Sequence, residues 1–243
     1  MNWTPGNILN VVVLRREIRD IKNILRRRMM ANMVDEIMNN YFVAKCKTLH
    51  SFRYRRFTFQ ENAENGVCDI ASLIGDLNLL SWLKDNGYQF GIGMYLCAIC
   101  NRNINTLKWL KYNQCPVDVI VCGIAVEFGY FEIAKWLVIN GFPMSEQACA
   151  NAAYRGSIKM LKWLRAKGCP WNKRTCLEAV EMGHLDVLKW ARENGCPWNE
   201  STCAMAIKHK HFGILEWAID NGCPWDLDVR DYAIESGYDW RYV

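Results

Sequence analysis

The sequence lacks the marks of several large classes of protein. None of its apolar runs reaches the roughly 18 residues that a membrane-spanning helix needs. An export signal is not expected, because charges directly follow the apolar run at residues 8–14 and no small-residue cleavage site comes after it. A glycine-rich phosphate loop, a catalytic carboxylate pair and a nucleophile motif are also missing. These absences argue against a membrane protein, a secreted protein and an enzyme.

One bulky residue recurs at a fixed interval of 27 through most of the chain. The grid tryptophans are Trp82, Trp109, Trp136, Trp163, Trp190 and Trp217. An alanine series keeps the same interval: Ala71, Ala98, Ala125, Ala152, Ala179, Ala206 and Ala233. Such regular spacing indicates copies of one structural unit. We expect a repeat array over residues 61–243, with about six repeats and a C-terminal half-repeat cap, and arrays of this kind mostly bind other molecules.

The sequence of each unit predicts two short helices. Asn172 is a residue type that accepts hydrogen bonds from the first turn of a helix, and Gly183 permits the positive φ that ends one. The apolar residues around Trp190 recur at helical spacing and predict a second helix. Asn194–Gly195 and then Pro197 end it. The expected fold is therefore all-α, a helix-turn-helix solenoid.

The grid tryptophans have two interpretations. A regular aromatic series could stack on bases or sugars, whereas an apolar stripe on a helix favours packing in the core. We favour the core, which predicts that Trp163→Ala and Trp190→Ala each destabilise the fold by about 3–5 kcal/mol. The link tryptophans Trp171, Trp198 and Trp225 are expected to be partly exposed.

Three segments resemble the ankyrin repeat: Ala-Ala-Tyr-Arg-Gly from Ala152, Gly-His-Leu-Asp-Val-Leu-Lys-Trp from Gly183, and Glu-Asn-Gly-Cys-Pro-Trp-Asn from Glu193. The ankyrin period is about 33 residues, so each unit is about six residues shorter, and the gap falls where ankyrin repeats carry a β-hairpin finger. The resemblance implies an ankyrin-like solenoid with these fingers shortened or absent. The Gly-Cys-Pro-Trp link looks like the short repeats of giant DNA viruses and protists.

The resemblance also implies where a partner protein binds. In ankyrin repeats the variable positions lie just before the alanine pair and just before the turn glycine. Carried onto this chain, the candidate partner-binding residues are Glu127, Phe128, Asn151, Tyr154, Arg155, Glu178, Glu181, Met182, Met205, Lys208, His209 and Tyr232. The main hypothesis is a non-enzymatic scaffold that holds another protein on the concave face of the array. It would be viral and act in the host cytoplasm or the virion.

Residues 1–60 lie off the grid and differ in charge. They hold 12 lysines and arginines against 4 acidic residues, whereas the remainder holds 18 against 21. An amphipathic helix is expected at about residues 10–40. The alternative function is nucleic-acid binding through the basic residues of this region, namely Arg15, Arg16, Arg26, Arg27, Arg28, Arg53, Arg55 and Arg56. We favour a basic N-terminal cap over the first repeat, because an array's open end must be covered.

Deleting residues 1–60 tests that cap. If the region covers the first repeat, a thermal melt of the truncated protein will show lower stability or aggregation. If it is a separate nucleic-acid arm, the melt will be unchanged and salt-sensitive binding to DNA or RNA will be lost.

The 12 cysteines mostly follow the same grid. Without an export signal, reduced thiols in a cytosol are expected. Stacked copies recur about 10 Å apart, too far for four thiolates to hold one zinc at about 2.3 Å. His209 and His211 with Cys203 lack a fourth ligand, and Cys97 and Cys100 have no second pair. We therefore expect no metal and no cofactor, and interpret the cysteines as small buried hydrophobic residues.

Overall fold

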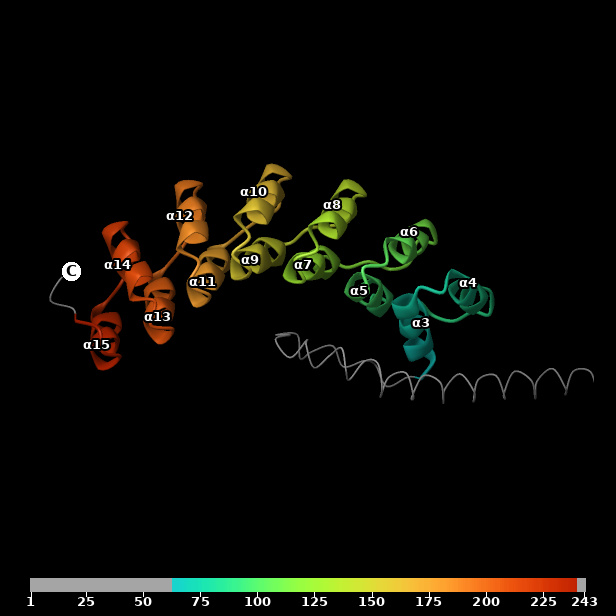
Figure 1. Ribbon diagram of the computed structural model, residues 1–243, viewed down its shortest axis with the longest axis horizontal. Coiled ribbons are helices and arrows are strands. Elements are labelled where there is room, and N and C mark those ends of the chain that lie inside the picture. Colours follow the sequence, from blue (N-terminus) through green and yellow to red (C-terminus); the bar gives the residue numbers. More distant parts are fainter. Residues whose placement is uncertain (1–62, 240–243) are drawn as a thin grey trace, which may run out of the picture. The chain divides into compact units, whose positions relative to one another are not determined.

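A computed structural model of the chain describes residues 63–239 (Figure 1). All regular structure in this range is α-helical, which confirms the all-α fold and the expected repeats without hairpin fingers for these residues. The chain divides into two compact units, residues 1–97 and 98–243. The predicted helix at residues 10–40 and all of the basic N-terminal candidates lie outside the described residues.

The described part of the first unit holds α3 (Ala63–Ile74), α4 (Leu77–Asp85) and the start of α5 (Gly93–Cys100). Asp76 begins α4, because its carboxylate accepts hydrogen bonds from Asn78 N at 3.1 Å and Leu79 N at 3.0 Å. The buried hydroxyl of Ser72 donates to Met94 O at 2.5 Å, so α3 is tied to α5 by a polar contact as well as by packing.

The carboxyl group of Asp69 on α3 gives the first unit a predictable response to pH. Burial raises the pKa of Asp69 from 3.8 to about 7. The folded state therefore binds more protons than the unfolded state between these two values, and the free energy of unfolding should fall as pH rises from about 4 to 7. We expect Asp69→Asn to be close in stability to the parent at pH 4 and more stable than the parent at pH 8 in chemical unfolding. The exposed Glu235→Gln serves as the control, and equal parent and Asp69→Asn midpoints at both pH values would contradict the prediction.

The second unit is a row of helix pairs. After the remainder of α5 come α6 (Ile104–Tyr112), α7 (Ile120–Glu127), α8 (Phe131–Ile139), α9 (Glu146–Tyr154), α10 (Ile158–Ala166), α11 (Lys173–Glu181), α12 (Leu185–Glu193), α13 (Glu200–Lys208), α14 (Phe212–Asp220) and α15 (Leu227–Glu235). In Figure 1 the first helices of the repeats (α7, α9, α11, α13, α15) follow the inner side of a shallow arc, and the second helices (α8, α10, α12, α14) follow the outer side.

Left-handed residues end both helices of a repeat. Gly129, Gly156 and Gly183 close first helices with φ of 65–77°, and Gly141, Gly168, Gly195 and Gly222 close second helices with φ of 78–82°. Three equivalent positions carry another residue and keep the conformation: Arg102 and Gln114 at φ 54° and Lys210 at φ 57°. The 27-residue register is therefore preserved in the backbone even where the glycine is missing.

The core runs between the first and second helices of each repeat. All seven residues of the alanine series are 0% exposed, so no larger side chain separates the helices at these positions. The second helices contribute fully buried leucines, among them Leu161, Leu164 and Leu188. The short helices are stabilised by this tertiary burial, because an isolated helix of nine residues is marginal in water.

The prediction that the grid tryptophans belong to the core is only partly right. All six are partly exposed, whereas Val187, Leu188 and Ala191 around Trp190 are 0% exposed. Those three residues face the first helix, so the indole of Trp190 lies on the flank of α12. It packs edge-on against Trp171, with ring centroids 5.9 Å apart, and Lys162 Nζ of the preceding repeat lies 5.7 Å from its ring. Trp217 repeats this arrangement with Trp198 and Lys189. The grid tryptophans therefore connect neighbouring repeats along the edge of the core.

The last described residues cover part of the open end of the array. The ring of Tyr238 packs against Phe212, with centroids 5.1 Å apart, and its hydroxyl donates to Glu216 at 3.1 Å. Tyr238 therefore folds back onto α14. Trp240 and Tyr242 lie outside the described residues.

Candidate functional site

The candidate partner-binding residues lie at the ends of the first helices and in the turns that follow them. The exposed side chains are Arg155, Met182, Lys208 and Tyr232. Partly exposed side chains are Glu127, Phe128, Tyr154, Glu181, Met205 and His209. Asn151 and Glu178 are only 6% and 4% exposed. We call the first ten residues the inner-face set, because their side chains reach solvent on the first-helix side of the second unit.

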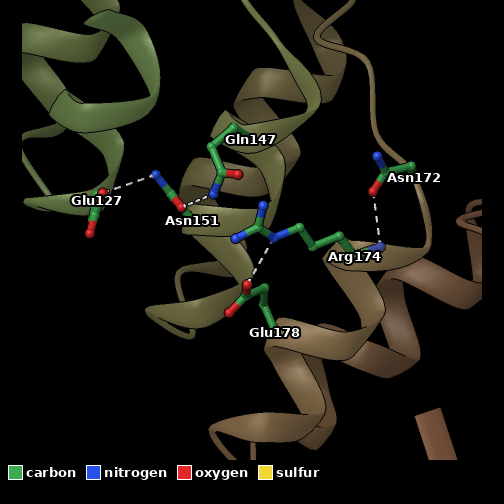
Figure 2. A network of polar contacts seen from close by, with 6 residues as sticks. All are labelled: Glu127, Gln147, Asn151, Asn172, Arg174 and Glu178. Atoms are coloured by element: carbon green, nitrogen blue, oxygen red, sulfur yellow. Dashed lines mark hydrogen bonds and ion pairs between the residues drawn. The ribbon is translucent and has the colours of Figure 1, made fainter. Parts of the chain in front are cut away.

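Asn151 of α9 joins two neighbouring first helices (Figure 2). Its amide nitrogen donates to Gly123 O of α7 at 2.8 Å and lies 3.5 Å from a carboxylate oxygen of Glu127. Its amide oxygen accepts from Gln147 at 2.5 Å. A buried amide needs such partners, since an unsatisfied one costs about 1–3 kcal/mol. The position before the alanine pair is therefore used here for contact between repeats.

Glu178 of α11 is held within its own helix. Arg174 Nε donates to Glu178 Oε1 at 3.1 Å, and this charge-assisted pair sits one turn apart on the helix (Figure 2). Asn172 begins the same helix by accepting from Arg174 N at 2.9 Å, as predicted. The Glu178 side chain is 6% exposed and that of Arg174 is 46% exposed, so the guanidinium is the part of this pair that faces solvent.

The turns are fixed by contacts that reach back one repeat. Arg155 Nη1 donates to Glu127 O at 3.0 Å. His184 Nε2 lies 3.2 Å from Tyr154 O, and His211 Nε2 lies 3.3 Å from Glu181 O. A carbonyl oxygen can only accept, so the proton in each of these contacts is on the imidazole nitrogen. These hydrogen bonds fix the backbone of the turns, so the side chains of the inner-face set project from a well-ordered backbone.

The inner-face set is chemically mixed. It combines carboxylates (Glu127, Glu181), cations (Arg155, Lys208) and rings (Phe128, Tyr154, Tyr232). Phe128 stacks on Tyr130 with ring centroids 5.3 Å apart, and the guanidinium of Arg102 lies 4.3 Å from the centre of the Tyr130 ring. In the described range there is no group of three His, Cys, Asp or Glu residues placed to hold a metal ion. Aromatic residues, methionine and arginine are enriched in protein interfaces, and the inner-face set contains all three kinds.

One segment of the second unit matches a known family. Residues 122–165 match the family of ankyrin repeats that occur in many copies. This stretch runs from α7 to α10 and contains the Asn151 contacts. No curated protein matches the sequence. The fold of the described residues is that of an ankyrin-like helical solenoid.

Two kinds of solved structure share a remote likeness with the chain. The human ASB11 ankyrin repeat domain is 14% identical with a TM-score of 0.40, and the match covers 72% of this chain and 85% of that one. The pentatricopeptide repeat protein PPR10 in complex with an 18-nt psaJ RNA element is 11% identical, also with a TM-score of 0.40, and the match covers 92% of this chain and 38% of that one. Likeness at this level carries no functional argument.

Sequence reasoning missed two features of the second unit. Arg165 and Arg192 lie 4.1 Å from the ring centres of Trp171 and Trp198, and buried cysteines lie side by side within single repeats. These arginines, tryptophans and cysteines also recur every 27 residues in the sequence. Which of them come into contact depends on how the helices stack, and the spacing alone does not show that.

Of the helices between residues 63 and 239, none is long and apolar enough to cross a membrane.

Proposed function

We propose that this protein is a non-enzymatic scaffold that binds another protein through the inner-face set. The proposal rests on the contrast between a backbone that is held in register and exposed side chains that vary. The alanine series and the turn contacts hold the backbone in register, while the side chains at the ends of the first helices change from repeat to repeat and reach solvent. Ankyrin repeats generally mediate protein–protein interaction, which agrees with this arrangement.

Binding through the inner face needs no hairpin fingers. The contacts would come from helix ends and turns, with Tyr154, Met182 and Tyr232 as apolar anchors and Arg155 and Lys208 as charged neighbours. Tyrosine offers a large contact area at a low cost in side-chain entropy, because it has only two χ angles. Asn151 and Glu178 would act by shaping this surface, since little of either side chain is accessible.

Capture experiments with matched variants test the proposal. Tagged full-length protein is expressed in the native cell or infected host, and captured proteins are quantified by mass spectrometry. The inner-face variant carries Arg155→Ala, Met182→Ala, Lys208→Ala and Tyr232→Ala, all at exposed positions. The control carries Tyr112→Ala and Ile139→Ala on second helices, where the side chains are 86% and 72% exposed. We expect only the inner-face variant to lose its partner at least tenfold; loss with the control alone would place binding on the second helices.

The proposal extends to the kind of organism that encodes the protein and to where the protein acts. The short unit with a Gly-Cys-Pro-Trp link supports a giant-virus or protist protein that acts in the host cytoplasm or is carried in the virion. Nucleic-acid binding through residues 1–60 stays a separate prediction. A partner held through phosphates would dissociate steeply as salt is raised, whereas a mixed protein contact would not.

A further inference from the structure

Three pairs of buried cysteines lie side by side, one in each of three consecutive repeats. One member comes from a first helix and the other from the link after the second helix of the same repeat. The pairs are Cys149 with Cys169, Cys176 with Cys196, and Cys203 with Cys223. In the first pair, Cys149 Sγ lies 4.0 Å from the backbone oxygen of Cys169. Five of the six residues are 0% exposed and Cys223 is 3% exposed.

The same backbone contact sets up each pair. The link thiol donates to the carbonyl of the residue that caps the first helix, at 3.4 Å for Cys169 to Ser145 O and 3.5 Å for Cys196 to Asn172 O. Cys223 donates to Asn199 O at 3.5 Å in the same way. That capping residue precedes the partner cysteine by four positions, so the link thiol lies over the turn of helix that carries its partner. Because the contact recurs three times, it follows from the repeat geometry.

The surroundings of a pair favour ionisation of the link thiol over that of the first-helix thiol. The hydrogen bond from Cys149 lowers the pKa of Cys169, burial opposes this, and the Arg165 guanidinium lowers it further. The pKa of Cys149 is raised, first by the same hydrogen bond and then by burial. The thiolate is the nucleophilic form of cysteine. The link cysteine is therefore the attacking member, and the first-helix cysteine can resolve the intermediate.

Cys122 provides a natural contrast. It occupies the same first-helix position and is also 0% exposed, but the link position of its repeat carries Phe142. Burial is the main cause that raises the pKa of Cys122 to about 12. It therefore has the environment of the other first-helix thiols without a link thiol in its own repeat.

We propose that each of the three pairs is an oxidation site, where a hydroperoxide converts the two thiols to a disulfide within one repeat. The link thiolate attacks one peroxide oxygen, the O–O bond breaks, and protonation of the leaving oxygen gives a water or an alcohol and a sulfenic acid. The first-helix thiol then loses its proton and attacks the sulfenic sulfur. The S–S bond forms, the S–O bond breaks, and the oxygen leaves as water. Two electrons pass from each pair to one peroxide.

Oxidation would stabilise the array reversibly. Each disulfide would close a loop of about 20 residues from a first helix to the following link. A loop of that size predicts a rise in Tm on the order of 5–10 °C per bridge for a chain of this length. Because the six residues are 0–3% exposed, we take hydrogen peroxide, the smallest hydroperoxide, as the oxidant. This site is independent of the proposed binding function.

The experiment uses reduced full-length protein and hydrogen peroxide. After quenching, the protein is denatured, its remaining thiols are alkylated, and peptides are mapped by mass spectrometry. We expect bridges that join Cys149 to Cys169, Cys176 to Cys196 and Cys203 to Cys223, with Cys122 alkylated. The Tm should rise and return to its starting value after dithiothreitol. Cys169→Ala should lose the first bridge alone, and Cys122→Ala should keep all three.

Three results would overturn the proposal: all six thiols still alkylated after peroxide treatment, oxidation that ends in sulfinic acid, or bridges that follow another connectivity. If Cys169→Ala fails to fold, the connectivity in the parent protein decides the question by itself.

Discussion

Replacing Trp190 with alanine is expected to lower the free energy of unfolding by about 2–4 kcal/mol. The change removes the edge contact with Trp171 and leaves Lys162 without the ring that it covers. The effect should be somewhat smaller than the 3–5 kcal/mol typical of a fully buried tryptophan, because this indole lies at the edge of the core. Chemical unfolding followed by circular dichroism measures the difference.

The matched control for this change is Tyr112→Ala. Tyr112 also lies on a second helix but is 86% exposed, so its removal should shift stability by no more than about 0.5 kcal/mol. If the two variants unfold at the same midpoint, the contacts of Trp190 contribute nothing to stability. The grid tryptophans would then need a functional explanation such as ligand stacking.

Replacing Gly156 with alanine is expected to cost about 2–3 kcal/mol. Gly156 has φ +65°, and a Cβ there would lie 2.6 Å from Cε1 of His184. The imidazole would have to move away from Tyr154 O, so the variant loses a hydrogen bond between repeats as well as adopting a strained backbone. Thermal melting of the parent and the variant measures the cost.

Gly168→Ala separates the two causes. Gly168 has φ +79°, but a Cβ there would meet nothing within 4 Å. Only the strain of the left-handed conformation applies, and we expect a cost of about 1 kcal/mol. Equal costs for the two variants would show that the His184 contact does not couple the repeats.

The architecture could be predicted from the sequence because one register repeats through the chain. The interval between Trp163 and Trp190, the stop at Gly183 and the cap at Asn172 are local signals, and each appears in the structure where it was expected. The helix boundaries follow for the same reason. For example, α13 lies at Glu200–Lys208, and α15 lies 27 residues later at Leu227–Glu235.

The remaining features depend on which side chains meet after stacking. A helical stripe does not distinguish Leu188 at its centre from Trp190 at its flank, although one is buried and the other is partly exposed. Asn151 looked like a free surface residue, but its amide spans the gap between α9 and α7. The contact between Cys149 and Cys169 was missed because copies were compared across repeats, while the two thiols meet within one.

The central claim is that the inner face of the array holds a protein partner. Hydrogen exchange on the captured complex tests it most directly, with the free full-length protein as reference. The account predicts slower exchange at the ends of α9, α11 and α13 and in the turns that follow them, with α10, α12 and α14 unchanged. Protection confined to the second helices or to residues 1–60 would contradict it.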